Sequence, residues 1–395
     1  MVPGQGEPVR DAVVVFDGPV ISYAGPAAQA PATPGATVTR AATVMPGLWD
    51  CHVHLMGLRS LDLSLVPQVP VALRAARTTA DLRAALDAGV TSVREVGGLG
   101  VHLARAVAEG SVDGPTIYAA GAVLSTTGGH GDLHGYPLPW VGELSEFRLA
   151  DGPAECARAA REQLRRNARV IKVCASGGVL SEVDHPIHQQ FTVAELTAIV
   201  EVAGMAERVV AAHCHGKPGI MAALEAGVHT IEHGTYLDEE AAVAMRECGA
   251  ILVPTRTIVQ EIVDSGAAPP FALAKLAAIA ERHADTVALA RQAGVTVAAG
   301  SDLAVSGGGP GSWGRHGREL SLLVEAGFTP LEAIEAATAA APATLGPQAP
   351  RAGLLAAGYD ADVLVLDADP LADIGVLARP AHITGVWQVG RRVKG

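Results

Sequence analysis

The sequence predicts an α/β protein, an eight-stranded (β/α)8 TIM barrel with a small β-sandwich. Three observations support this fold class. Short apolar runs alternate with Ala- and Leu-rich amphipathic stretches from about residue 45 to about residue 340, as expected for repeated β and α units. The length of 395 residues suits one barrel with a smaller attached unit. Hydrophobic residues make up 49% of the chain and aromatic residues only 4%, so Ala, Val, Leu and Ile must form most of the core.

Eight apolar or β-branched runs are the candidate barrel strands. They are Met45–His52, Val90–Val96, Thr116–Ala120, Val170–Ala175, Val209–His213, His229–His233, Ile251–Pro254 and Val295–Gly300. Stretches with helical periodicity lie between them: Ala72–Ala88, Ala154–Asn167, Val193–Ala206, Glu239–Cys248 and Phe271–Ala293. Helices of this length serve as crossover connections between parallel strands, which favours a closed parallel barrel.

The two ends of the chain have a different pattern. Ala12–Phe16 reads as a short strand among turn residues, and Asp362–Asp367 and Ile383–Val389 carry alternating strand signals. We expect residues 1–45 and 345–395 to meet in one small β-sandwich domain, with residues 46–344 forming the barrel.

Charge and hydropathy exclude several classes of partner. The formal net charge is −12 and no long basic run occurs, which argues against nucleic acid or an anionic membrane surface as a partner. No apolar stretch reaches the roughly 20 residues of a membrane span, and the first residues lack a signal-peptide pattern. The five cysteines are scattered and contain no CxxC pair, so we expect reduced thiols and a cytoplasmic protein.

Potential metal ligands follow the predicted strands. His52 and His54 are two positions apart, so both side chains point to the same face of a strand. An isolated pair of this kind is more often two hydrogen-bonded histidines. However, His213, His233 and Asp302 also stand at carboxyl ends of predicted strands, where TIM-barrel enzymes place their catalytic groups. Imidazole nitrogens and carboxylate oxygens are ligands for Zn²⁺ and similar divalent cations.

Lys172 occupies the corresponding position on the fourth predicted strand. A lysine in an apolar strand is costly to bury without a partner. The residues alone leave three interpretations open: an ion pair, a Schiff-base nucleophile, or a modified metal ligand.

Five short segments resemble the amidohydrolase superfamily, and with the turn near the end of the chain the resemblance spans nearly the whole chain. They are Pro46–His54, Lys172–Gly178, Ala212–Gly216, Ile231–Thr235 and Gly300–Asp302. The segments Thr127–Asp132 and Gly177–Val179 are similar to the branch of Xaa-Pro dipeptidases and metal-dependent carboxypeptidases, which includes ochratoxin-type amidases. The turn Ala357–Asp362 resembles the opening of that family's terminal β-sandwich, with Tyr359 where lysine is usual.

This resemblance implies two divalent metal ions, Zn²⁺ first, with Mn²⁺ or Co²⁺ as alternatives. His52, His54 and Asp302 would hold one ion, and His213 and His233 the other. Lys172 would be carboxylated and bridge the two ions as a carbamate. Trp49 and Ser301 depart from the commoner residues at their positions, but neither departure removes a ligand. By the same pattern His215 is a structural or supporting group.

The implied reaction is hydrolysis of an amide or peptide bond by a metal-bridging hydroxide. Asp302 would take the proton from the attacking group and deliver it to the leaving amine. His130 is a second candidate catalytic residue, and His134, Tyr236 and Arg256 are candidates for binding the substrate. The expected substrate is a small dipeptide or N-acyl amino acid that releases a C-terminal L-amino acid. Because related enzymes are often multimers, we also expect a homo-oligomer.

Two alternatives stay open from the sequence. A metal-independent Schiff-base lyase or aldolase would use Lys172 as its nucleophile. A non-catalytic scaffold would keep the fold without the reaction, although every expected ligand is present.

Overall fold

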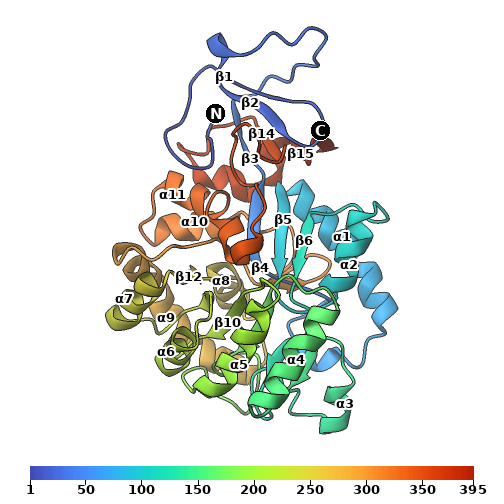
Figure 1. Ribbon diagram of the computed structural model, residues 1–395, viewed down its shortest axis with the longest axis vertical. Coiled ribbons are helices and arrows are strands. Elements are labelled where there is room, and N and C mark those ends of the chain that lie inside the picture. The colour runs from blue at the N-terminus through green and yellow to red at the C-terminus, as the bar shows by residue number, and fades with distance from the viewer.

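The structure is a computed structural model that describes all 395 residues. Two parallel sheets form its centre (Figure 1). The four-stranded sheet has the order β13 (Leu303–Val305), β4 (Leu48–Leu58), β5 (Val90–Glu95) and β6 (Thr116–Ala119). The six-stranded sheet has the order β12 (Ile251–Val253), β11 (Thr230–His233), β10 (Val210–Cys214), β9 (Ile171–Cys174), β7 (Val123–Ser125) and β8 (Phe147–Leu149).

Backbone hydrogen bonds join the two sheets along both seams. At one seam the amide of Arg169, just before β9, donates to the carbonyl of Ala119 in β6 at 2.8 Å. At the other seam, residues 296–299 run between β12 and β4: Ala298 donates to Leu252, and Ala299 accepts from Cys51. The segment at this seam corresponds to the predicted eighth strand, Val295–Gly300. Its only β-bridge is the one between Val297 and Leu252. The predicted TIM-barrel-like fold is confirmed.

Helices surround the strands, as Figure 1 shows. They are α1 (Val71–Asp87), α2 (Gly100–Ala108), α3 (Leu138–Gly142), α4 (Pro153–Arg165), α5 (Val193–Gly204), α6 (Lys217–Glu225), α7 (Glu239–Cys248), α8 (Arg256–Ser265), α9 (Pro270–Gln292), α10 (Arg318–Glu325) and α11 (Pro330–Ala336). Short 3-10 turns are η1 (Ala27–Gln29), η2 (Leu63–Leu65), η3 (Ala341–Gln348), η4 (Ile374–Ala378) and η5 (Pro380–His382). Each of the five predicted helices is present within two residues of its expected ends.

Local sequence explains where several of these helices begin. α5 and α11 both start with a capping box, in which Thr192 pairs with Glu195 and Thr329 with Glu332. The threonine oxygen accepts from an otherwise unpaired helix amide, and the glutamate accepts from the threonine amide. α7 starts at the cap Asp238 and ends at a glycine in the left-handed region.

One predicted strand is divided in the structure. Met45–His52 was expected as a single barrel strand, but Thr43–Pro46 is β3 of an antiparallel sheet and β4 starts only at Leu48. The chain changes sheets at Gly47, whose amide donates to the carbonyl of Asp362. A Cβ at Gly47 would lie 2.2 Å from the hydroxyl of Thr91, so the passage beside β5 requires glycine.

The two ends of the chain come together beside the barrel (Figure 1). An antiparallel sheet has the order β16 (Arg391–Lys394), β15 (Ile383–Gln388), β14 (Val363–Leu366) and β3. A hairpin of β1 (Ala12–Phe16) and β2 (Ile21–Pro26) packs on it, with the ring of Phe16 meeting Trp387 edge-on at 6.4 Å. Both predicted C-terminal strands are therefore present.

The core is aliphatic, as the composition predicted. The largest hydrophobic cluster has 64 buried residues, and its aromatic members are Phe191, Trp313 and Phe328. Small side chains of this kind let helices approach parallel strands closely. No helix combines the length and the apolarity that crossing a membrane requires.

Candidate metal centre

The carboxyl ends of the barrel strands surround a cavity with about 1020 Å³ of empty space, its open mouth included. Every metal ligand predicted from the sequence lines this cavity. The six residues are His52, His54, Lys172, His213, His233 and Asp302. The structure therefore brings together side chains that come from β4, β9, β10, β11 and the end of the eighth-strand segment.

His52, His54 and Asp302 form the first group of potential ligands, with one ligand atom from each within 4.8 Å of the others. Nε2 of His54 lies 3.2 Å from Oδ1 of Asp302, and Nε2 of His52 lies 3.7 Å from the same oxygen. The backbone of Asp302 has a φ of 59°, and its amide donates to the carbonyl of His52 at 2.7 Å. This left-handed turn holds the carboxylate over the two histidines.

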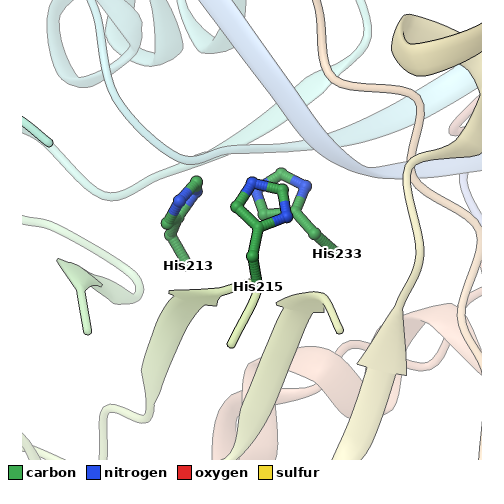
Figure 2. Close-up of side chains that lie close together, drawn as sticks. All are labelled: His213, His215 and His233. Atoms are coloured by element: carbon green, nitrogen blue, oxygen red, sulfur yellow. The ribbon is translucent and has the colours of Figure 1, made fainter. Parts of the chain in front are cut away.

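His213, His215 and His233 form a second group, in which one ligand atom from each also lies within 4.8 Å of the others. Figure 2 shows the three rings together above the ends of two neighbouring strands. The ring centroids of His213 and His233 are 4.5 Å apart, and His215 lies 4.7 and 4.8 Å from them. His215 was expected only as a structural or supporting group, although the alternation that puts His52 and His54 on one strand face also puts His215 beside His213.

Each histidine of the two groups has one ring nitrogen fixed by a partner that faces away from the centre. Nδ1 of His52 lies 2.7 Å from Glu232, and Nδ1 of His54 lies 2.8 Å from the Gly97 carbonyl. In the second group, Nδ1 of His215 meets Thr235 and Nδ1 of His233 meets Thr255. His213 differs from the others, because its Nε2 rather than its Nδ1 meets a partner, the Gly177 carbonyl.

The remaining nitrogen of each ring is therefore free to bind a cation. This arrangement is typical of metal sites, because the outer partner fixes the tautomer and the orientation of the ligand. The donor set, imidazole nitrogens with one carboxylate, fits Zn²⁺ and similar divalent ions.

Lys172 lies at the floor of the cavity and is 2% exposed. Its Nζ is 3.5 Å from Nε2 of His52, and burial lowers the pKa of the amine. Its hydrogen-bonding neighbour is thus another nitrogen rather than a carboxylate. No ion pair satisfies Lys172 at this position, which argues against the simplest of its three interpretations.

Four of the five histidines are held in the neutral form that metal binding needs. The exception is His54: burial alone would lower its pKa, but the hydrogen bond and charge of Asp302 raise it. Burial, followed by Lys172, lowers the pKa of His52 to about 4. Burial and neighbouring imidazoles lower the pKa values of His213, His215 and His233 well below the ordinary value. Burial alone would raise the pKa of Asp302, but His52, His54 and Lys172 lower it, so the carboxylate is ionised.

A buried ion pair supports the first group from inside the barrel. Arg94 has no exposed surface, and its guanidinium donates to both carboxylate oxygens of Glu232 at 2.7 and 2.8 Å. Glu232 in turn holds Nδ1 of His52. Glu232 was expected only as part of a motif and Arg94 was not expected at all, because nothing local in β5 predicts a partner on β11.

Two hydrophobic walls enclose the cavity above the ligands. One wall includes Met56, Leu58, Val123 and Phe147, which belong to one buried cluster. The other wall comes from a second cluster: Leu61, Val179, Leu180, Ile258, Val259, Ile262, Leu276 and Ala304. Lys172 and Asp302 are the only Lys, Arg, Asp or Glu side chains among the 24 lining residues.

Of the predicted residues beyond the ligands, only His130 lines the cavity. His134 is outside the lining, and its Nε2 is buried without a partner. The ring of Tyr236 lies under the guanidinium of Arg282 at 4.9 Å, and Arg256 donates to the Leu322 carbonyl. The structure does not bring these three residues to the cavity, and their role in binding substrate stays a prediction.

Comparisons with known proteins agree with this geometry. The family model described as "Amidohydrolase family" matches residues 43–393. Ochratoxinase of Aspergillus niger is 41% identical over 416 aligned residues, which cover 100% of this chain and 85% of the relative. The crystal structure of that ochratoxinase superposes with a TM-score of 0.93 and covers 100% of this chain and 94% of the other.

Two further solved structures are similar. A prolidase in complex with N-methylphosphonate-L-proline is 36% identical, with a TM-score of 0.89 and coverage of 96% and 94% of the two chains. A Xaa-Pro dipeptidase with bound methionine is 30% identical, with a TM-score of 0.82 and coverage of 97% and 94%. The resemblance that the motifs predicted is confirmed, and the chain belongs to the amidohydrolase family.

Proposed function

We propose that this protein is a metal-dependent amidohydrolase that cleaves an amide or peptide bond and releases a C-terminal amino acid from a dipeptide or an N-acyl amino acid. The observation that carries the proposal is the pair of three-residue ligand groups around Lys172, at the floor of one cavity. The names of the similar proteins, ochratoxinase and prolidase, support the same reaction class.

We infer that the site takes two divalent cations, with Zn²⁺ first and Mn²⁺ or Co²⁺ as alternatives. His52, His54 and Asp302 would hold one, and His213 and His233 the other, with His215 available beside them. Two bound cations would lower the pKa of a water molecule to near neutrality and polarise the scissile carbonyl.

We also propose that Lys172 carries a carboxyl group on Nζ. The amine would add to carbon dioxide and lose one proton, which gives a carbamate with a negative charge. Two features support this: the lysine is buried 3.5 Å from Nε2 of His52, and no carboxylate pairs with it. An anion at this position would attract both cations, whereas an ammonium would repel them.

Asp302 is the proposed general base. Its carboxylate has 21% of its surface exposed, toward the cavity, while one oxygen stays within 3.7 Å of both histidines of its group. From this position Asp302 would accept the proton of the attacking water and donate it to the leaving amine. His130, on the side of the cavity, is the proposed second group in contact with the substrate.

The walls of the cavity indicate which amides fit best. Both walls are apolar, and no arginine lines the cavity. Burial of apolar groups contributes roughly 25 cal/mol per Å², whereas a charged side chain without a partner would be penalised there. We therefore expect substrates with apolar groups on both sides of the scissile bond, such as N-acyl derivatives of Leu, Met or Phe.

A direct test is to screen dipeptides and N-acyl amino acids with metal-loaded protein. We expect amide hydrolysis by the wild type, loss of at least 10²-fold in kcat for Asp302→Asn, in line with the usual contribution of a general base, and full activity for Asp17→Asn, an exposed control. Borohydride trapping of a carbonyl compound on Lys172, without any bound metal, would favour the Schiff-base alternative. Metal binding without hydrolysis of any member would favour a scaffold.

The setting of the protein is also a proposal. Free cysteines, four of them buried, suit the reducing cytoplasm, which we propose as the location of the protein.

We propose a homo-oligomer, to be checked by light scattering. We also propose a division into a barrel of residues 46–344 and a β-sandwich of residues 1–45 and 345–395. The pairing of β3 with β14 supports that division.

A further inference from the structure

A chain of polar side chains leads from His130 away from the cavity. Nδ1 of His130 lies 2.7 Å from the hydroxyl oxygen of Ser181. The Ser181 hydroxyl donates to Oδ1 of Asp184. The other oxygen of Asp184 accepts from the amide of Gly178 at 3.1 Å and from the side chain of Gln190 at 2.9 Å.

The positions of the protons in this chain follow from counting donors. All the partners of Asp184 are donors, as an ionised carboxylate requires. The hydroxyl of Ser181 has one proton, and that proton is directed to Asp184. Ser181 must therefore accept from His130, so the proton of the neutral imidazole is on Nδ1 and the lone pair is on Nε2.

The ring of His130 is also fixed in space. It stacks on His213 with ring centroids 4.3 Å apart and an angle of 25° between the planes. The ring also lies close to Gly178, where a Cβ would be 2.1 Å from Cε1 of the imidazole. The backbone amide of His130 donates to Gln190 at 3.0 Å. Nε2 has no hydrogen-bond partner, keeps some exposed surface, and belongs to a residue that lines the cavity.

Lys275 of α9 binds the loop that carries Ser181 and Asp184 and so holds it against the helix. Its ammonium donates to the carbonyls of Gly178 at 3.2 Å, Ser181 at 2.6 Å and Asp184 at 2.5 Å. The next residue, Leu276, lines the cavity. One helix therefore supports both the apolar wall and the loop behind His130.

We propose that Ser181 and Asp184 are positioning residues that keep His130 in its Nδ1-protonated form, so that Nε2 accepts a hydrogen bond from an N–H or O–H group of the substrate. Lys275 holds these two residues in place. The inference deepens the proposed function and rests on it, because it assigns a role to the cavity wall next to the ligands. His130 would orient the amide above the ligand groups while Asp302 moves the proton.

The tautomer of His130 tests the positioning role without any catalytic assay. Zinc-loaded protein with ¹⁵N-labelled histidine is measured by NMR, and His130→Gln identifies the signals of His130. We expect a protonated Nδ1 in the wild type and in Ser22→Ala, whose hydroxyl bonds only to Val15. In Ser181→Ala we expect the proton on Nε2, the form that an unconstrained imidazole favours. Ser181→Thr keeps the hydroxyl and should keep the tautomer.

Kinetics test the substrate role. For Ser181→Ala and Asp184→Asn we expect kcat to fall by roughly 100-fold, the effect of a misplaced catalytic contact, at unchanged zinc content and unfolding midpoint. Ser181→Thr should recover most of this loss. A wild-type His130 protonated on Nε2, or a Ser181→Ala protein with the wild-type tautomer and kcat, would overturn the inference. A wild type with the expected tautomer but no hydrolysis of any amide would instead contradict the proposed function and, with it, the substrate contact of Nε2.

Discussion

Replacing Arg94 with methionine removes four hydrogen bonds from the interior of the barrel. The guanidinium donates twice to Glu232, once to the hydroxyl of Thr230 and once to the carbonyl of Cys51. Methionine has a similar length but no donor, so Glu232 would stay buried with its charge largely uncompensated. Removing one partner of a buried ion pair costs about 3–5 kcal/mol, and we expect the free energy of unfolding to fall by that amount.

Urea unfolding followed by tryptophan fluorescence measures this loss. Arg83→Met is the matched control, because Arg83 and Asp87 form a half-exposed pair one helical turn apart, and such pairs contribute less than about 1 kcal/mol. In the double variant Arg94→Met with Glu232→Gln, no charge is buried, so much of the loss should be recovered. Equal losses for Arg94→Met and Arg83→Met would refute this reasoning.

The pH dependence gives a second readout with a definite sign. Burial alone would raise the pKa of Glu232, but Arg94, His52 and Lys172 lower it below the ordinary value. The resulting stabilisation is present above the ordinary glutamate pKa of about 4.3 and is lost as the pH falls below that value. Without Arg94, burial dominates and the pKa rises, so Arg94→Met should lose less stability than the wild type, or even gain, as the pH is lowered. If the wild type and Arg94→Met lost the same stability as the pH falls, Arg94 could not be the group that lowers the pKa of Glu232.

Other predictions address the site directly. Dialysis against a chelator should abolish amide hydrolysis and lower the unfolding temperature, and added Zn²⁺, Mn²⁺ or Co²⁺ should restore both; activity that survives complete metal removal would exclude the proposed mechanism. Lys172→Ala should bind less metal, as measured by elemental analysis, and a short carboxylic acid such as propionate should partly restore activity if a carbamate normally stands there. Leu180→Ala removes apolar surface from one wall and should raise KM for apolar substrates by about 10-fold, with little change in kcat. Gly178→Ala would force the ring of His130 to move, so kcat should fall by at least about 10-fold at constant metal content.

The metal ligands could be predicted because their positions follow from strand ends. Each of His52, Lys172, His213 and His233 belongs to a β-strand that the apolar pattern identified, and the barrel brings these ends together. The pairing of Arg94 with Glu232 could not be predicted in this way. It joins β5 to β11 across the interior of the barrel, and no local pattern reports which side chains meet there.

Loop residues were harder to place for a related reason. Tyr236 and Arg256 come shortly after strands β11 and β12, but the direction of a side chain in a loop depends on the turn that follows the strand. Thr255, for example, has a φ of 56°, and α8 begins immediately after it. Six helices were not among the predicted ones: α2, α3, α6, α8, α10 and α11. In α2 and α6, Gly100 and the pair Pro218 and Gly219 weaken the helical pattern.

The pairing of β3 with β14 has a consequence for synthesis of the chain. These strands are joined residue by residue although they are roughly 320 residues apart in the sequence. At typical translation rates of about 5–20 residues per second, β3 would leave the ribosome roughly 15–60 s before its partner. During that interval β3 is an unpaired apolar edge next to the first barrel strand, and such edges favour aggregation. A nascent chain of this protein would therefore depend on chaperones to protect its first strands until β14 emerges.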